Sequence, residues 1–226
     1  MVRKSLFDEW TQQYEQWFRE PVGKLVLDIE GGLIRDLLNL KPGEKVLDAG
    51  CGSGIFTTDF LSAGAQVTGL DISEPMLRVA RNKTKGYSFW AVQGDMQQLP
   101  FKDESFDKTV SITALEFIAD ARGAIDELFR VTRPGGCVVA ATLNSLSPWA
   151  TRRKAKTQKG QRHILEDAIF RSPDEILACS PYSGEVKTAI HFQKDCDPAR
   201  AIEIEQAGRL QGLDTGAFVV VCWGKP

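Results

Sequence analysis

The residues best suited to chemistry form a glycine-rich turn early in the chain. The turn reads GCGSG at residues 50–54, and it follows a short apolar run that carries Asp48 near its end. Glycine lets a backbone turn sharply from a strand into a helix and lets a ligand approach main-chain atoms. The helix start behind such a turn offers free N–H groups and a partial positive charge. We expect a ligand site here, with Asp48 either contacting an amine of the ligand or orienting the turn.

Two further acids follow the glycine turn at the ends of predicted strands. Asp71 closes the strand predicted over residues 66–70, and Asp95 follows the strand predicted over residues 88–93. In open parallel sheets, ligands bind outside the carboxyl ends of the strands. A carboxylate can accept two hydrogen bonds from a ribose diol, and an acid beside a backbone N–H can bind the amino edge of adenine. The three strand ends therefore predict a ribonucleoside site that lacks a phosphate clamp.

These positions depend on an alternation of short β-branched runs and helical patterns, which is typical of a parallel α/β sheet. The predicted strands cover residues 45–49, 66–70, 88–93, 107–112, 137–143, 185–193 and 217–223. The segment Phe7–Leu38 is predicted to be helical in two or three pieces, interrupted by Pro21 and by Gly31-Gly32. The stretch between the last two strands is too long for a hairpin and predicts an insertion with its own helix.

The composition excludes several classes of protein. The chain has 226 residues, of which 42% are hydrophobic and 26% charged, so it is not disordered, collagen-like or a disulfide scaffold. The net charge of −2 provides no overall basic field for nucleic acid. The 5 cysteines are scattered, and no apolar stretch approaches the length of a membrane span or marks a secretory signal. We expect a cytoplasmic protein, monomeric or homodimeric, with no membrane span and no nucleic-acid partner.

In this order and spacing, the motifs resemble the class I S-adenosylmethionine-dependent methyltransferases, in particular the type 11 branch that acts on small molecules. The motifs are VLDAGCGSG (46–54), VTGLDISEPML (67–77), GDMQQLPFKDESFD (94–107), ALEFIAD (114–120) and RPGG (133–136). The resemblance implies one domain over residues 1–226 with a Rossmann-like seven-stranded sheet, an antiparallel last strand, helices on both faces and a helical cap. It also implies an N-terminal helical lid at residues 1–40 and a cap insertion at residues 144–182.

The resemblance further implies S-adenosylmethionine as cofactor and S-adenosylhomocysteine as product. Asp71 would bind the ribose hydroxyls, Asp95 the adenine amino group, and Ile72 and Met76 would flank the adenine unless they are plain core residues. No metal site is expected. The predicted cofactor-binding residues are Asp48, Gly50, Gly52, Gly54, Asp71, Ile72, Met76, Gly94, Asp95, Met96, Ile112 and Thr113.

The acceptor side of the site is less well marked. Tyr14 belongs to the aromatic N-terminal segment that the family places over the cofactor. Glu116 matches the acid of an L-E-H segment in quinone-type relatives, although Phe117 replaces the histidine here. His163 lies beside a basic segment, residues 152–162, which is a solvated face, a site for an anionic acceptor or, least in keeping with the net charge, a nucleic-acid contact. The catalytic residue stays unassigned, because in-line methyl transfer needs alignment more than a nucleophile.

Two other functions remain open at this point. A protein that binds S-adenosylmethionine as a regulatory or partner subunit, without transferase activity, would carry the same nucleoside site. A dinucleotide-dependent oxidoreductase shares a glycine turn and an acid near Asp71, but the G-x-G-x-G spacing and Gly94-Asp95 disfavour it. The main hypothesis is transfer of a methyl group to a small-molecule acceptor, with an anionic acceptor as one form of it.

Overall fold

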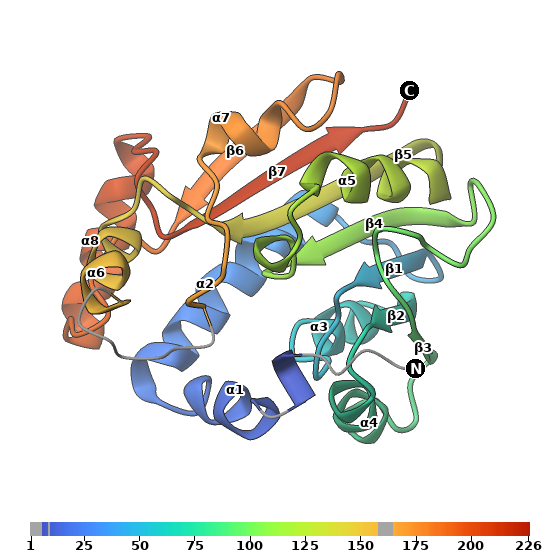
Figure 1. The fold of residues 1–226 in the computed structure, drawn as a ribbon, viewed down its shortest axis with the longest axis horizontal. Helices are drawn as coiled ribbons and strands as arrows, with labels where there is room; N and C mark the ends of the chain where they lie inside the picture. Colours follow the sequence, from blue (N-terminus) through green and yellow to red (C-terminus); the bar gives the residue numbers. More distant parts are fainter. Residues whose placement is uncertain (1–5, 9, 158–164) are drawn as a thin grey trace.

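The computed structural model describes residues 6–8, 10–157 and 165–226. Its centre is a seven-stranded sheet in the order β3-β2-β1-β4-β5-β7-β6 (Figure 1). The strands are β1 (Lys45–Ala49), β2 (Gln66–Asp71), β3 (Phe89–Gln93), β4 (Phe106–Ile112), β5 (Thr132–Leu143), β6 (Gly184–Ala189) and β7 (Phe218–Gly224). Only β7 runs antiparallel to its neighbours. The predicted Rossmann-like sheet with an antiparallel last strand is therefore confirmed.

Helices cover both faces of this sheet. They are η1 (Leu6–Asp8), α1 (Thr11–Trp17), α2 (Pro21–Leu38), α3 (Thr57–Ser62), α4 (Glu74–Lys83), η2 (Leu115–Phe117), α5 (Ala121–Val131), α6 (Pro148–Thr157), α7 (Pro173–Leu177) and α8 (Pro198–Leu210). Successive strand residues point to opposite faces. Val139 thus packs in one core with α2, α3 and α8, while Val138 packs in a second core with α5 and α7. The predicted helix between the last two strands is α8.

The strand boundaries differ from the prediction in two places. β5 begins at Thr132, so Pro134-Gly135-Gly136 lies inside the strand rather than before it. The cause is an irregularity in which the chain between Thr132 and Cys137 passes Phe106 to Lys108 of β4, with Gly135 at a φ of 76°. β6 ends at Ala189, because the next residue, Ile190, has a φ of 64° and turns the chain out of the strand.

The predicted interruption at Gly31-Gly32 is wrong. Both glycines lie inside α2, which is continuous for 18 residues, whereas Pro21 does mark its first turn. The buried face of α2 includes Val26, Leu33 and Ile34. Glycine costs roughly 1 kcal/mol in a helix interior, and the burial of this face outweighs that cost.

The helices η1, α1 and α6 occupy one end of the sheet. They lie on the side to which the arrowheads of β4 and β5 point (Figure 1). α1 has no buried residues, whereas α2 and α7 pack into the two cores. Within the three described stretches, no helix is long and apolar enough to cross a bilayer. The carboxyl ends of the parallel strands therefore open toward α1 and α6.

Gly23 fixes how closely α1 approaches α2. A Cβ at Gly23 would lie 1.9 Å from the carbonyl oxygen of Trp17, whereas a Cβ at Gly32 would meet only Arg35 Nη2 at 3.7 Å. We predict that Gly23→Ala lowers the unfolding free energy by roughly 1–3 kcal/mol, since overpacking must push α1 away. The matched Gly32→Ala should raise it by up to about 1 kcal/mol through helix propensity. Urea unfolding measures both, and equal stabilities for the two variants would contradict this packing.

Candidate functional site

The glycine turn after β1 is held in left-handed backbone. Gly50, Gly52 and Gly54 have φ values of 79°, 53° and 75°. A Cβ on Gly50 would lie 2.4 Å from Ala114 Cβ, whereas one on Gly52 would have no neighbour within 4 Å. Side chains rarely tolerate this backbone. Gly50 is therefore required by packing, and Gly52 borders open space.

Asp71 holds the turn from the end of β2. Its Oδ2 accepts a hydrogen bond from Gly52 N at 2.8 Å, and its Oδ1 accepts one from Ser73 N at 2.8 Å. Burial raises the pKa of Asp71, although these backbone donors oppose the rise. Each carboxylate oxygen has two lone pairs. Asp71 can therefore brace the turn and still accept hydrogen bonds from a ligand.

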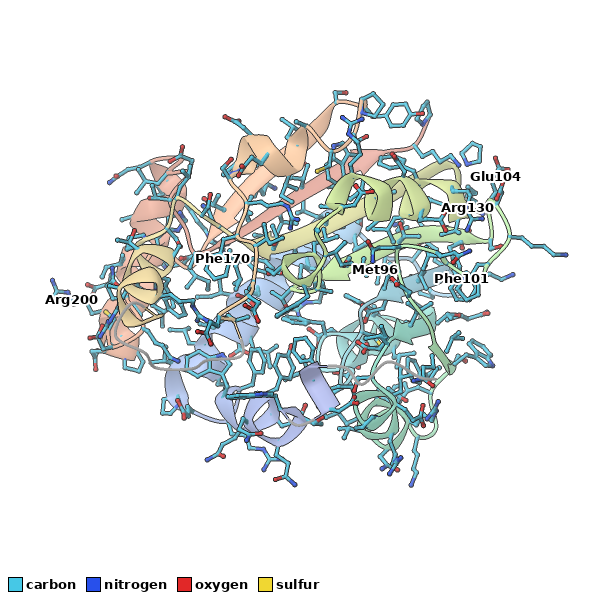
Figure 2. All side chains as sticks on the ribbon, viewed as in Figure 1. Met96, Phe101, Glu104, Arg130, Phe170 and Arg200 are labelled. Atoms are coloured by element: carbon cyan, nitrogen blue, oxygen red, sulfur yellow. The ribbon has the colours of Figure 1, made fainter. Side chains whose placement is uncertain are left out.

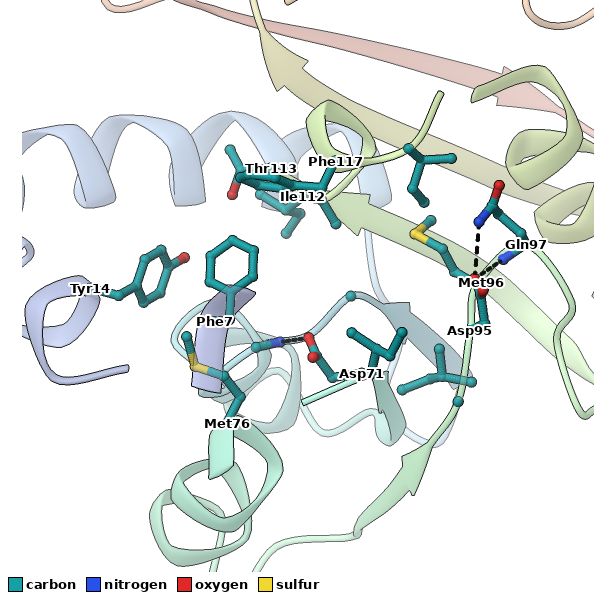
Figure 3. Close-up of a pocket in the computed structure, with 17 residues that line it drawn as sticks. Phe7, Tyr14, Asp71, Met76, Asp95, Met96, Gln97, Ile112, Thr113 and Phe117 are labelled. Atoms are coloured by element: carbon teal, nitrogen blue, oxygen red, sulfur yellow. Dashed lines mark hydrogen bonds between the residues drawn. The ribbon is translucent and has the colours of Figure 1, made fainter. Parts of the chain in front are cut away.

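A cavity of about 360 Å³ lies over the turn and the carboxyl ends of the central strands (Figure 3). It is lined by Phe7, Tyr14, Gly50, Gly52, Leu70, Asp71, Ile72, Met76, Gly94, Asp95, Met96, Gln97, Ile112, Thr113, Ala114, Phe117 and Ile118. Every predicted cofactor-binding residue except Asp48 and Gly54 lines it. Ligand pockets are typically of about this size or larger. The structure thus brings together residues that are spread over a hundred positions of sequence.

Asp48 and Gly54 lie behind the turn. Asp48 is buried, and its Oδ2 accepts a 2.6 Å hydrogen bond from the Thr57 hydroxyl. Burial raises the pKa of Asp48 to about 7. A Cβ on Gly54 would approach Ala80 Cβ to 3.2 Å, so Gly54 lets α4 pack closely. In this structure, both residues shape the turn rather than line the cavity.

The rim of the cavity combines acidic and apolar groups. Asp95 is exposed, and its Oδ1 accepts hydrogen bonds from Gln97 N at 2.9 Å and Gln97 Nε2 at 3.4 Å. Ile72 is 42% exposed at the rim, whereas Met76 is buried. Sequence reasoning missed Phe7 and Gln97, because a residue of a short 3-10 helix or of a loop leaves no periodic pattern that shows it facing a cavity.

The N-terminal helices are tied across the glycine turn. Asp8 accepts a 2.7 Å hydrogen bond from the Ser73 hydroxyl. Glu15 on α1 accepts a hydrogen bond from the Ser53 hydroxyl and pairs with Lys83 Nζ at 2.6 Å. The segment expected to be a lid therefore contacts both the turn and α4 by polar side chains.

A second cavity of about 240 Å³ adjoins the first. The two share Phe7, Tyr14, Thr113 and Phe117 as lining residues, and Phe7 meets Phe117 edge-on at 4.7 Å. In Figure 3, the side chains of Phe7 and Tyr14 point toward Thr113 and Phe117, the other two residues of this common wall. The remaining lining residues are Trp10, Gln13, Trp17, Phe18, Val26, Glu30, Glu116, Leu143, Ser147, Trp149, Arg153, Leu165, Phe170, Lys194 and Ala217.

Cationic side chains border the second cavity on aromatic rings. The Arg153 guanidinium of α6 lies 5.6 Å from the centre of the Phe170 ring, which Figure 2 labels in the segment after α6. Lys194 Nζ lies 3.9 Å from the centre of the Trp17 ring. Burial lowers the pKa of Arg153. A desolvated cation of this kind favours an anion in the cavity.

Acidic groups line the same cavity. Glu30 and Glu116 are both buried. Burial raises the pKa of Glu116 to about 7 and that of Glu30 well above its ordinary value. Tyr14, whose pKa burial and Glu30 raise, lies at the common wall. His163 lies outside the described residues. Sequence reasoning missed Glu30, although an acid on the apolar face of an amphipathic helix is a readable signal.

Comparison with known proteins agrees with this geometry. A methyltransferase domain model matches residues 47–140. The chain is 34% identical over 149 residues to a malonyl-[acyl-carrier protein] O-methyltransferase of Serratia marcescens, covering 66% of this chain and 57% of that protein. It is 36% identical over 139 residues to a demethylmenaquinone methyltransferase of Streptomyces griseus, covering 61% of this chain and 59% of that protein. The chain thus spans less than two thirds of these relatives.

The fold comparison extends over nearly the whole chain. A solved S-adenosylmethionine-dependent methyltransferase of Thermotoga maritima superposes with a TM-score of 0.72 at 22% identity, covering 98% of this chain and 99% of that one. Residues 47–140 thus match a methyltransferase domain, and the chain has the fold of the class I S-adenosylmethionine-dependent methyltransferases. The resemblance expected from the glycine turn and the two strand-end acids is confirmed for the family, the fold and the cofactor.

The site of this methyltransferase fits S-adenosylmethionine. Gly52 leaves open space where a ligand could approach the backbone, and Asp71 lies beside it with lone pairs to spare. The apolar Ile72 is exposed at the rim, as a residue that packs on an adenine would be before binding. Among the residues that the structure describes, no three histidine, cysteine or acidic side chains gather into a metal site.

Glu116 should make the stability of the methyltransferase depend on pH. The folded carboxyl binds its proton up to about pH 7, against an ordinary pKa of 4.5. The unfolding free energy should therefore fall by about 3 kcal/mol as pH rises from 4.5 to 7, at about 1.4 kcal/mol per pKa unit. We predict that Glu116→Gln removes this part of the fall, and that the exposed control Glu203→Gln does not. Urea unfolding at pH 5 and pH 8, without cofactor, measures it; identical pH dependence in all three proteins would refute the buried carboxyl.

Proposed function

We propose that the chain transfers the methyl group of S-adenosylmethionine to a small-molecule acceptor that occupies the second cavity. One observation carries the proposal: the two cavities share the wall formed by Phe7, Tyr14, Thr113 and Phe117. A donor in the first cavity and an acceptor in the second would meet at this wall. Holding two reactants in such an arrangement can contribute roughly 7–11 kcal/mol to catalysis.

The first cavity would hold the nucleoside and methionine parts. We assign the ribose hydroxyls to Asp71, the adenine edge to Asp95 and Met96, and the adenine faces to Ile72 and Met76. Gly50, Gly52, Gly94, Ile112 and Thr113 complete the assigned set, with Asp48 and Gly54 supporting the turn from behind. Ten of these positions line one cavity, which supports the assignment.

The cofactor supplies an electrophilic methyl group on a positively charged sulfur. The chain's own residues would align the acceptor for in-line displacement and keep water away. The common wall has aromatic faces from Phe7, Tyr14 and Phe117. Such a face stabilises a nearby desolvated cation by about 2 kcal/mol. The contacts of Asp8 with Ser73 and of Glu15 with Lys83 would hold this wall in place.

The acceptor would carry an anionic group. Arg153 and Lys194 border the second cavity, and the rest of its wall is mainly aromatic. The Serratia relative is named for methylation of a malonyl group, which is an acid. These observations support an acceptor with an apolar body and one negative charge, placed with the charge toward α6. A protein that only binds the cofactor would have no use for such a cavity, so turnover separates the two functions.

Turnover with acidic acceptors tests the proposal. We predict formation of S-adenosylhomocysteine when the purified protein, S-adenosylmethionine and a panel of aromatic and aliphatic acids are combined. Arg153→Gln should raise KM for the active acid at least tenfold with little change in kcat, because it removes binding that is equal in ground and transition states. The exposed control Arg200→Gln should leave both constants unchanged. No turnover above background with any acceptor, despite cofactor binding, would favour the non-catalytic partner protein.

A further inference from the structure

Two carboxyl groups in the second cavity lack the partners that buried acids normally have. Glu116 Oε1 accepts a hydrogen bond from Leu143 N at 2.8 Å, but its Oε2 has no hydrogen bond of normal geometry, although Thr142 is near. Glu30 on α2 is only 6% exposed, and within the described stretches its carboxyl makes no hydrogen bond or ion pair. Burying a carboxyl group without partners is costly.

Glu205 shows what a compensated buried acid looks like in this same fold. Its Oε2 accepts a hydrogen bond from His191 N at 2.8 Å and lies 3.1 Å from His191 Nδ1. Its Oε1 pairs with Arg209 Nε at 2.7 Å. These partners lower the pKa of Glu205 despite its burial. Among the described residues, Glu30 has no such set, and Glu116 has backbone N–H donors and the nearby Thr142 and Arg171 but no ion pair. Both carboxyls are therefore less fully compensated than that of Glu205.

The groups that face the two carboxyls come from η2, α8, α1 and the segment before α7. Glu30 is acted on by Glu116 of η2 and by Glu205 of α8, both negative in their ionised forms. Tyr14 of α1 is neutral, and the negative charge of Glu30 helps to raise the pKa of its hydroxyl group. Arg171, before α7, acts on Glu116, but its guanidinium donates to the carbonyl oxygens of Leu115 and Ile118 at 2.7 and 2.5 Å. Glu30 therefore faces a second carboxyl, and the guanidinium that acts on Glu116 is already bound to backbone carbonyl oxygens.

We propose that Glu30 and Glu116 together bind the amino group of the acceptor and take its proton, so that the acceptor is a primary or secondary amine. This rests on the proposed function, because it assigns the acceptor of the same site. An ammonium group would supply the missing positive charge and N–H donors. The surrounding rings, among them Trp10, Trp17 and Phe117, also favour a cation. A carboxylate nucleophile would instead add a third acid to the enclosure.

The proton and electron balance is simple. A carboxylate of the pair accepts one proton from R–NH3⁺, which leaves the neutral amine R–NH2. The nitrogen lone pair then forms the N–C bond to the methyl group. The C–S bond breaks at the same time, and the electron pair of the C–S bond stays on sulfur. The product is R–NH2⁺–CH3, and the carboxyl releases its proton to solvent when the product leaves. An amine suits this pair better than a hydroxyl, whose pKa lies far above that of any carboxyl group.

The cations that line the same cavity then complete the binding of the acceptor. Arg153 and Lys194 would bind an acidic group while Glu30 and Glu116 bind the amine. The acceptor class is therefore an aromatic or apolar amino acid, or another compound with both charges. This gives three probes that differ by one group each: phenylalanine, 3-phenylpropanoate without the amine, and 2-phenylethylamine without the acid.

Calorimetry on the protein loaded with S-adenosylhomocysteine tests the proposal without needing turnover. Wild type should bind phenylalanine at least tenfold more tightly than 3-phenylpropanoate. Glu30→Gln and Glu116→Gln should abolish that preference, while Arg153→Gln should abolish only the preference for phenylalanine over 2-phenylethylamine. The exposed control Glu203→Gln should behave as wild type. Near-ultraviolet circular dichroism shows whether each variant is folded.

The opposite results are equally definite. Tighter binding of 3-phenylpropanoate, retention of the amine preference in both Gln variants, or binding of neither amine at millimolar concentration would overturn the proposal. Each of those outcomes leaves methyl transfer to another acceptor intact, whereas failure to bind S-adenosylhomocysteine would remove the proposed function itself. With any amine that turns over, kcat/KM should rise with pH as the pair ionises, and Glu116→Gln should lower it at least a hundredfold.

Discussion

The left-handed glycine turn after β1 is the constraint on which the rest of the site depends. Gly50 can take this path only because no side chain separates it from Ala114, and the path brings Gly52 N to Asp71. The same turn receives the N-terminal helices through Ser53 and Glu15. One backbone conformation thus positions the strand-end acid, opens the first cavity and provides the surface on which α1 closes it.

The two cavities are built largely from different parts of the chain, apart from the four residues of their common wall. The first cavity draws on the ends of the parallel strands, which are set by the sheet. The second draws on α1, α2, α6 and the segments around β5 and β6, which surround the sheet. Tyr14 and Thr113 belong to both. Under the proposed function, substitutions in the helices that line only the second cavity would alter the acceptor and leave the cofactor site unchanged.

Sequence reasoning reached the strand-end site because each part has a local cause. Gly50, Asp71 and Asp95 follow β-branched runs, and the order of such runs determines which ends meet. Glu30 left a local signal, an acid on the buried face of α2, but the pattern could not show that Glu116 of η2 lies in the same cavity. The predicted interruption at Gly31-Gly32 was wrong for the opposite reason. Glycine does disfavour a helix locally, but burial of the face around Ile34 outweighs that preference.

The central claim is that the glycine turn and Asp71 bind a sulfur nucleoside. Calorimetric titration of the wild type with S-adenosylmethionine, S-adenosylhomocysteine and NAD tests it most directly. We predict micromolar binding of the first two, no binding of NAD, and at least tenfold weaker binding of both nucleosides to Asp71→Asn. Binding of NAD in their place, or wild-type affinity in Asp71→Asn, would contradict it.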